Sequence, residues 1–222
     1  MTQSEEHIPR AYDSAARAYA ASFLQELDHK PLDRQLLARF ADSVRPGRPV
    51  IDLGCGPGHT TAHLSALGLT ATGVDLSPKM IDQAQSCFPS VEFAVANIFD
   101  LPYEDQAYHG CLAFYCLVNS HPKELESAFR EIWRVLKDDG LLLLSFHVGE
   151  ECIVADDFLG SGSTLEFFAF RESFVTATLA KAGFIDIEAI ERPPYETEYP
   201  SVRCYVFARR PHAARQTLLT GP

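Results

Sequence analysis

The sequence has no long hydrophobic run. Its longest uninterrupted apolar segment, Cys111 to Val118, is far shorter than the roughly 18 to 20 residues that cross a bilayer. Met1 to Arg10 are polar and lack the apolar stretch of a signal peptide. We therefore expect a protein without a membrane segment or a leader.

Positive charge is also scarce. Lysine and arginine number 19 against 30 aspartate and glutamate residues, which gives a formal net charge of −11. Residues 1–111 hold 8 basic and 14 acidic side chains, and residues 112–222 hold 11 and 16, so neither half is basic. Binding to nucleic acid or to an anionic membrane by bulk electrostatics is therefore excluded, and we expect neither as a partner.

The cysteines show no CxxC pair and no short repeated spacing. There are six of them: Cys55, Cys87, Cys111, Cys116, Cys152 and Cys204. In a chain of this size, this pattern is typical of reduced thiols and not of a disulfide framework. We therefore expect a cytoplasmic protein.

What the sequence does contain is an alternation of short apolar strands with amphipathic helices. Strands are predicted at residues 50–53, 69–74, 91–95, 111–115, 141–146, 185–190 and 202–208. The last two are joined without a helix, so one of them is expected to run antiparallel. The pattern predicts an α/β fold: a Rossmann-like, doubly wound, mostly parallel seven-stranded sheet with the last strand pair antiparallel.

No Gly/Ser-rich linker divides the 222 residues, so we predict a single domain over residues 1–210 and a flexible tail over 211–222. Residues 1–45 are predicted to form an N-terminal helical cover. Residues 149–173 follow the fifth strand and combine a Gly/Ser-rich turn with three phenylalanines. Since ligands bind beyond the carboxyl ends of such strands, this insert is the candidate for acceptor recognition.

Three glycines follow the first strand at alternate positions, Gly54, Gly56 and Gly58. Such a loop lets the backbone turn sharply and lets a ligand approach the main chain. Asp75 ends the next strand, 23 residues after Asp52, and a carboxylate there accepts hydrogen bonds from ribose hydroxyls. The glycine loop and Asp75 together indicate a nucleoside-bearing ligand. The alternative is an ordinary strand-to-helix turn.

The details of the loop point to one family. A nicotinamide site expects GxGxxG, whereas residues 52–58 read D-x-G-x-G-x-G and residues 73–80 read GVDLSPKM. The chain here resembles the class I S-adenosylmethionine-dependent methyltransferases. Residues 97–102 and 134–141 are similar to two further, weaker motifs of that family. The resemblance spans about residues 10 to 210.

The resemblance implies S-adenosyl-L-methionine as cofactor and S-adenosyl-L-homocysteine as product. The glycine loop would hold the methionine part, Asp75 the ribose, and neighbouring residues the adenine. Asn97 stands where the family usually has Asp, and its amide oxygen can still accept a hydrogen bond from the adenine amine. The implied cofactor-binding residues are Gly54, Cys55, Gly56, Gly58, Asp75, Leu76, Met80, Asn97, Ile98, Ala113 and Phe114.

Tyr12 and Tyr19 extend this set. The segment Tyr12-Asp13-x-x-Ala16-x-x-Tyr19 resembles one that covers the cofactor in related enzymes, and a spacing of seven puts both rings on one helical face. The alternative is a surface helix with two packed tyrosines.

Two histidines are candidate catalytic residues. His147 directly follows the apolar run of residues 141–146, and His121 follows the fourth strand, so both are expected at the carboxyl edge of the sheet. Either could act as a general base where the nucleophile must lose a proton. The alternative for each is a loop histidine with a structural hydrogen bond.

We expect no catalytic metal. Metal-dependent, catechol-type members of the family need carboxylates at the end of the fourth strand, where this chain has Phe114, Tyr115 and Cys116. His59 and His63 have a spacing that could seat zinc, but no third ligand is evident near them.

The sequence therefore favours metal-independent methyl transfer to a small-molecule acceptor by direct displacement. The arginines Arg171, Arg192 and Arg203 could form a carboxylate or phosphate clamp for it. A non-catalytic S-adenosylmethionine-binding sensor or assembly module is the alternative from another class. A nicotinamide-dependent oxidoreductase and a protein methyltransferase are further ones. The oligomeric state, monomer or homodimer, stays open.

Overall fold

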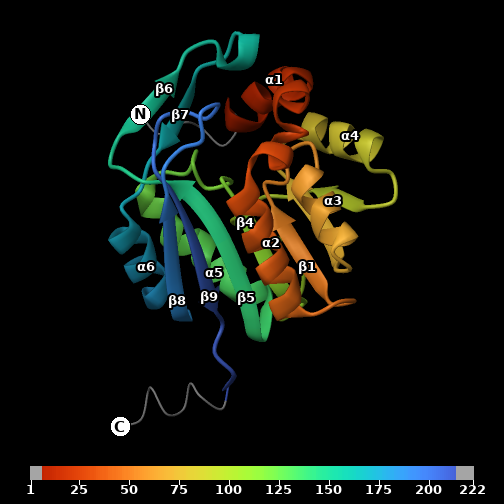
Figure 1. Cartoon of the computed structure of the whole chain (residues 1–222), viewed down its shortest axis with the longest axis vertical. Coiled ribbons are helices and arrows are strands. Elements are labelled where there is room, and N and C mark those ends of the chain that lie inside the picture. Colours follow the sequence, from red (N-terminus) through yellow and green to blue (C-terminus); the bar gives the residue numbers. More distant parts are fainter. Residues whose placement is uncertain (1–6, 214–222) are drawn as a thin grey trace.

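The computed structural model describes residues 7–213, and the fold is built on one seven-stranded sheet with the order β3-β2-β1-β4-β5-β9-β8 (Figure 1). β9 runs antiparallel to both neighbours, β5 and β8, and the remaining pairs are parallel. The predicted fold class is thus confirmed. The strands are β1 (Pro49–Leu53), β2 (Thr70–Asp75), β3 (Glu92–Val95), β4 (Tyr108–Phe114), β5 (Leu136–His147), β8 (Ile185–Arg192) and β9 (Arg203–Arg209).

Helices cover both faces of this sheet. One hydrophobic cluster holds the apolar side chains of α5 and α6 against the central strands, and a second holds those of α2 and α3 on the other face. The α-helices are α1 (His7–Phe23), α2 (Pro31–Val44), α3 (His59–Ala66), α4 (Pro78–Cys87), α5 (Leu125–Val135) and α6 (Glu172–Lys181). Short 3₁₀ turns lie at η1 (Glu26–His29), η2 (Pro122–Glu124) and η3 (Phe158–Gly160).

The insert after β5 contains a small hairpin that the sequence pattern did not predict. β6 (Cys152–Ala155) pairs antiparallel with β7 (Leu165–Phe168) outside the main sheet. In Figure 1 this hairpin and α1 lie together over one end of the sheet. Because both strands have only four residues and little burial, their hydrophobic pattern is too weak to distinguish them from a loop.

Two further boundaries differ from the prediction. β5 begins at Leu136 and not at 141, because Leu136 already pairs with Tyr108 before an irregularity in the register. Of the predicted helical cover over residues 1–45, α1 lies over the sheet edge, whereas α2 packs against the sheet face. Residues 1–6 and 214–222, and with them most of the predicted tail, lie outside the described residues.

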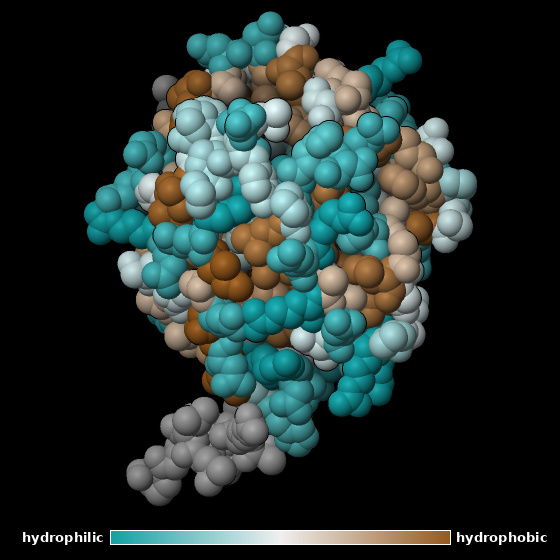
Figure 2. Space-filling view, in the orientation of Figure 1, coloured by the Kyte–Doolittle hydropathy of each residue, from teal (hydrophilic) through white to brown (hydrophobic). Residues whose placement is uncertain are grey.

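No helix between residues 7 and 213 is both long and apolar enough to cross a membrane. In the orientation of Figure 2, hydrophilic and hydrophobic residues are interspersed over the visible face.

The glycine loop packs tightly against the end of β4. Gly54 has a φ of +62°, and a Cβ placed there would lie 2.3 Å from the Cβ of Cys116. Any side chain at this position would therefore push the β1 loop and the β4 end apart. Glycine is therefore favoured at position 54 for two reasons, the positive φ and the lack of space for a side chain.

We predict that Gly54→Ala destabilises the fold far more than Gly160→Ala. Gly160 also has a positive φ, +74°, but nothing lies within 4 Å of a Cβ placed there. The control therefore measures the backbone strain alone, whereas Gly54→Ala adds an overlap that typically lowers stability by ~1–3 kcal/mol. Urea denaturation of both variants measures the difference, and equal losses would contradict the tight packing.

Candidate functional site

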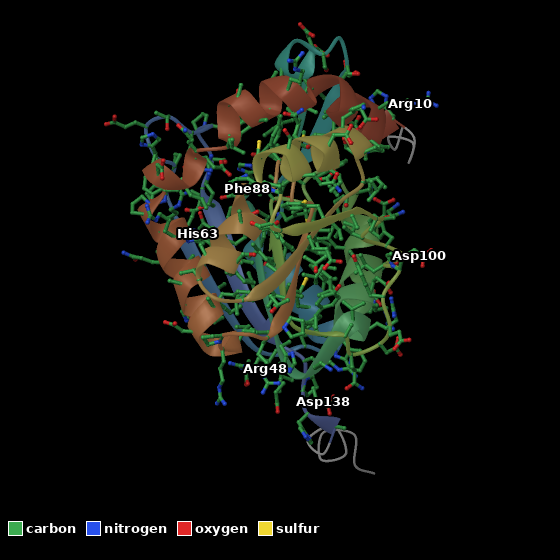
Figure 3. The ribbon with its side chains drawn as sticks, turned by 90° about the vertical axis from the view of Figure 1, so that its right-hand side faces the viewer. Arg10, Arg48, His63, Phe88, Asp100 and Asp138 are labelled. Atoms are coloured by element: carbon green, nitrogen blue, oxygen red, sulfur yellow. The ribbon has the colours of Figure 1, made fainter. Side chains whose placement is uncertain are left out.

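Two neighbouring cavities open at the carboxyl ends of the strands, beneath α1 and the β6–β7 hairpin. The first is the smaller of the two. It receives Gly54 and Gly56 from the loop after β1, Asp75 from the end of β2, and Phe114 from the end of β4. In Figure 3, α1 crosses the top of the molecule, and the labelled Arg48 and Asp138 mark the opposite end.

Most of the predicted cofactor residues meet in this first cavity. Those that line it are Tyr12, Tyr19, Gly54, Gly56, Asp75, Leu76, Met80, Asn97, Ile98 and Phe114. Cys55 lines the second cavity. Gly58 and Ala113 line neither within the described chain: Ala113 is buried inside β4, and Gly58 packs closely on Phe93.

Asp75 fixes the floor of the first cavity. Its Oδ2 accepts a hydrogen bond from the Gly56 N–H at 3.0 Å, and its Oδ1 accepts one from the Ser77 N–H at 2.8 Å. Burial raises the pKa of Asp75 to about 6, although these N–H donors act in the opposite direction. Each oxygen keeps a free lone pair, so the carboxylate can accept two further donors from a ligand.

Asp52 has a different role from Asp75. It is 1% exposed, and its Oδ2 accepts hydrogen bonds from the hydroxyls of Thr60 and Thr61, each at 2.6 Å. Burial raises its pKa to about 6. The carboxylate thus joins the end of β1 to the first turn of α3 and holds the glycine loop in shape from behind.

Helix α1 is attached to the first cavity at two points. The Tyr12 hydroxyl donates to Asn119 Oδ1 at 2.7 Å. Asp13 Oδ1 accepts from the Ser77 hydroxyl at 2.6 Å and from the Lys79 N–H at 3.0 Å. These contacts, and the position of Tyr12 and Tyr19 in the cavity wall, exceed what a surface helix with two packed tyrosines requires.

The second, larger cavity adjoins the first. Tyr12, Tyr19, Phe114 and Tyr115 line both, together with Gly54 and Gly56. Tyr115 has a positive φ of +52°, which is strained for a non-glycine residue and turns the chain at the end of β4. The boundary between the cavities is therefore formed by four aromatic rings.

The insert closes the second cavity with aromatic side chains. Phe158 contacts Tyr12 and Phe167, with ring centroids 5.5 Å apart in both pairs, and lies 6.4 Å from Tyr19. The backbone of the insert is bound below as well, since the Asn119 amide donates to Glu166 O at 2.8 Å. The insert and α1 thus share one aromatic cluster over the two cavities.

Part of the chain matches a known protein family. Residues 50–140, which run from β1 through β4 and α5 into β5, match the family model described as a methyltransferase domain. The chain contains a methyltransferase domain. The resemblance to the class I S-adenosylmethionine-dependent methyltransferases is thereby confirmed.

Relatives and solved structures agree with this domain. A malonyl-[acyl-carrier protein] O-methyltransferase of Erwinia billingiae is 31% identical over 145 residues, which cover 65% of this chain and 55% of that protein. The chain spans about half the length of the curated relatives it matches.

Two solved structures share the fold of the domain. The [4+2]-cyclase SpnF aligns with a TM-score of 0.74 at 18% identity and covers 96% of this chain and 98% of its own. A phosphoethanolamine N-methyltransferase 2 of Haemonchus contortus, in complex with S-adenosyl-L-methionine, has a TM-score of 0.69 at 18% identity. It covers 90% of this chain and 57% of its own.

The two candidate histidines lie in different surroundings. His147 lines the second cavity, and its Nδ1 is 2.6 Å from the Ser201 hydroxyl. His121 lines neither cavity within the described chain. Its Nδ1 accepts a hydrogen bond from the Lys123 N–H at 3.2 Å, and its ring contacts Phe168, so it caps the turn η2.

Of the three candidate arginines, Arg203 lines the second of these two cavities, and Arg171 and Arg192 line neither of them. Arg171 is exposed and pairs with Glu150. Arg192 is 6% exposed and belongs to a buried ionic network. The described residues contain no group of three or more His, Cys, Asp or Glu side chains that could hold a metal ion. His59 pairs instead with Glu26, at 2.9 Å.

The buried ionic network lies behind the second cavity and was not predicted from the sequence. Asp33 Oδ2 accepts from Arg192 Nη2 at 3.1 Å and from the Tyr205 hydroxyl at 2.8 Å. Glu198 accepts from Arg192 Nη1 at 2.6 Å and Nη2 at 2.9 Å. The guanidinium also stacks on the Tyr195 ring at 4.0 Å. This network joins α2, β8 and β9.

Other lining residues were not singled out as ligand contacts from the sequence. Pro9, Ser77, Asn119 and Ser120 line the first cavity, and Lys30 and Glu198 the second. Asn119 could have been found from its neighbourhood, because it stands two residues before His121 in the segment after β4.

We predict that Arg192→Met lowers the free energy of unfolding by ~3–5 kcal/mol, because it leaves Asp33 buried without its ion-pair partner and removes both guanidinium hydrogen bonds to Glu198. Arg130→Met is the matched control: Arg130 pairs with Glu126 on the exposed face of α5, and its loss should be barely measurable. Urea denaturation compares the two variants. Equal losses in the free energy of unfolding would contradict the prediction, because the buried network would then stabilise the fold no more than an exposed ion pair.

We predict that His147 titrates at a pKa of about 4. Burial lowers this pKa from the ordinary 6.5, and the nearby Arg203 guanidinium adds to the effect. Because the folded protein then binds fewer protons than the unfolded chain, this group reduces stability as the pH falls from about 6.5 to about 4. NMR of the imidazole, assigned with His147→Gln, measures the midpoint, and a midpoint near 6.5 would refute the burial.

Proposed function

We propose that the methyltransferase domain binds S-adenosyl-L-methionine in the first cavity and transfers its methyl group to a small-molecule acceptor in the second. The observation that carries this proposal is the junction of the two cavities at Tyr12, Tyr19, Phe114 and Tyr115. A donor and an acceptor bound on either side of this boundary would meet at it.

The residues of the first cavity fit this cofactor. Asp75 keeps lone pairs for two ribose hydroxyls beyond its bonds to the Gly56 and Ser77 N–H groups. Asn97 Oδ1 accepts one hydrogen bond, from the Phe99 N–H at 3.0 Å, and can accept a second from the adenine amine. Leu76 and Met80 would flank the adenine, with Ile98 at its edge.

The remaining implied contacts complete the proposal for the cofactor. Gly54 and Gly56, with their positive φ values, would let the methionine part approach the main chain. Cys55, which faces the second cavity, would contribute from that side, and Gly58 and Ala113 would act by shaping the loop and strand behind it. Tyr12 and Tyr19 would cover the bound molecule.

When bound, the cofactor supplies a methyl group on a sulfonium, which is already activated for displacement. The protein's contribution is then to hold the acceptor close and in line, which can lower the barrier by ~7–11 kcal/mol. The aromatic cluster of α1 and the insert would keep water away from the junction. We propose that this transfer uses no metal.

His147 is our candidate general base, because it lines the acceptor cavity and is neutral at neutral pH. Its lowered pKa makes it a weak proton acceptor, so it would suit an acceptor that is already acidic. His121 stays a second candidate only if the segment after β4 rearranges when the acceptor binds. The cytoplasmic location and the absence of nucleic-acid and membrane partners likewise stay predictions.

The non-catalytic sensor or assembly module is the competing function. A protein that only binds the cofactor needs no acceptor space, and the second cavity therefore supports the transferase. The [4+2]-cyclase SpnF has a similar fold, and because one fold can host several chemistries, the fold alone does not decide between the two functions. Turnover of S-adenosylmethionine to S-adenosylhomocysteine with an acceptor distinguishes the two functions.

We predict that S-adenosylhomocysteine binds the protein and that Asp75→Asn weakens this binding at least ~tenfold. The matched control is Asp82→Asn, since Asp82 is an exposed carboxylate of α4 that pairs with Lys79. Isothermal titration calorimetry measures both. Unchanged affinity in Asp75→Asn, or no binding to the wild type, would reject the cofactor assignment.

The same titration has a pH dependence. Ribose hydroxyls favour the ionised Asp75, whose pKa in the free protein is about 6. Affinity should therefore be constant above about pH 7 and fall by ~tenfold between about pH 7 and pH 5. Asp75→Asn should remove this dependence, whereas Asp82→Asn should retain it.

A further inference from the structure

Arg203 has an unusual position for a buried cation. It starts β9, is 4% exposed and lines the second cavity. Its Nη1 donates to the backbone carbonyls of Tyr199, at 2.5 Å, and of Ser201. These bonds hold one edge of the guanidinium against the link between β8 and β9.

The other edge of the same guanidinium has no hydrogen-bond partner. The Nε of Arg203 is buried and makes no hydrogen bond, and none is found for Nη2 among residues 7–213. Nε–H and one N–H of Nη2 are parallel donors, the fork that binds a carboxylate through two hydrogen bonds. An unmade hydrogen bond of a buried donor is unfavourable, so this edge is a place where a ligand can bind.

Glu198 does not fill this edge. Its Oε2 forms an ion pair with Arg203 Nε at 3.4 Å, but the contact does not have hydrogen-bond geometry. Its two oxygens already accept from Arg192 Nη1 and Nη2, and Oε2 also accepts from the Tyr195 N–H at 2.8 Å. The hydrogen bonds that Glu198 accepts thus come from Arg192 and Tyr195, and the two N–H donors on the open edge of Arg203 remain unused.

The other charged groups of the second cavity favour an anionic ligand over a cationic one. Glu26 is paired with His59 and Lys30, and Glu198 with Arg192, Lys30 and Arg203, so neither carboxylate is free for an amine. His147 is neutral at neutral pH and adds no charge. The two unused N–H donors of this edge match the two oxygens of one carboxylate.

We propose that Arg203 binds a carboxylate of the methyl acceptor, so that the acceptor is an organic acid. This inference rests on the proposed function, because it assigns the substrate class of the second cavity. The rings of Phe158 and Phe167, which form the wall contributed by the insert, suit an apolar, planar body for that acid.

Calorimetry on the full chain saturated with S-adenosylhomocysteine tests this assignment with three matched probes. They are 2-naphthoate, its neutral analogue 2-naphthamide, and the cation 2-naphthylmethylammonium. We expect 2-naphthoate to bind at least ~tenfold more tightly than either of the others, as two charge-assisted hydrogen bonds would provide. No binding of 2-naphthoate at about 5 mM, or a preference for the amide or the cation, would overturn the proposal.

Two variants connect the preference to Arg203. Arg203→Met removes the charge, and Arg203→Lys keeps the charge but removes the fork, so both should lose the ~tenfold preference for 2-naphthoate. The control Arg171→Met, at an exposed arginine of the insert, should keep it. A preference that persists in both Arg203 variants would overturn the proposal.

The affinity for S-adenosylhomocysteine separates this test from that of the proposed function. If the wild type does not bind S-adenosylhomocysteine, the proposed function fails. If the Arg203 variants bind S-adenosylhomocysteine like the wild type, they are folded, and a loss confined to 2-naphthoate then supports the carboxylate site.

Discussion

The two hydrogen bonds accepted by Asp75 are the interaction on which the first cavity depends. They join the glycine loop, through Gly56, to the first turn after β2, through Ser77. The Ser77 hydroxyl in turn accepts from the Met80 N–H to cap α4 and donates to Asp13 of α1. One carboxylate thus positions the loop below the cavity and, through one intermediate residue, the helix above it. Ligand binding and the order of this edge are therefore coupled through the same atoms.

The second cavity is built on a different principle. Its far side depends on buried ions, with Arg192 held between Asp33 and Glu198, and its upper side depends on aromatic contacts around Phe158. The side chains of a buried ionic network keep their positions, because leaving any of the charges without its partner is strongly unfavourable. Contacts between rings tolerate sliding, so the insert can adapt to the acceptor while the charged side keeps its geometry. This division fits a site in which Arg203 orients the acceptor and the insert encloses it.

Local patterns were sufficient to predict the sheet and to place Gly54, Gly56 and Asp75 at one end of it. Gly54, Gly56 and Asp75 follow strands whose hydrophobic runs are unambiguous, and parallel strands bring their carboxyl ends together whatever the rest of the chain does. The ionic network could not be predicted, because Arg192 and Asp33 are 159 residues apart and neither carries a local pattern. His121 was expected near the site from its position after β4, yet short-range bonding to Lys123 turns it into a cap.

The central claim is that a nucleoside-bearing methyl donor lies over Asp75 with its sulfur at the junction of the two cavities. A crystal structure of the complex with S-adenosylhomocysteine tests it most directly. The account predicts both ribose hydroxyls within hydrogen-bond distance of Asp75, roughly 2.5–3.0 Å, and the sulfur between Tyr19 and Phe114. A complex with the ribose away from Asp75, or with the sulfur turned away from the second cavity, would contradict it.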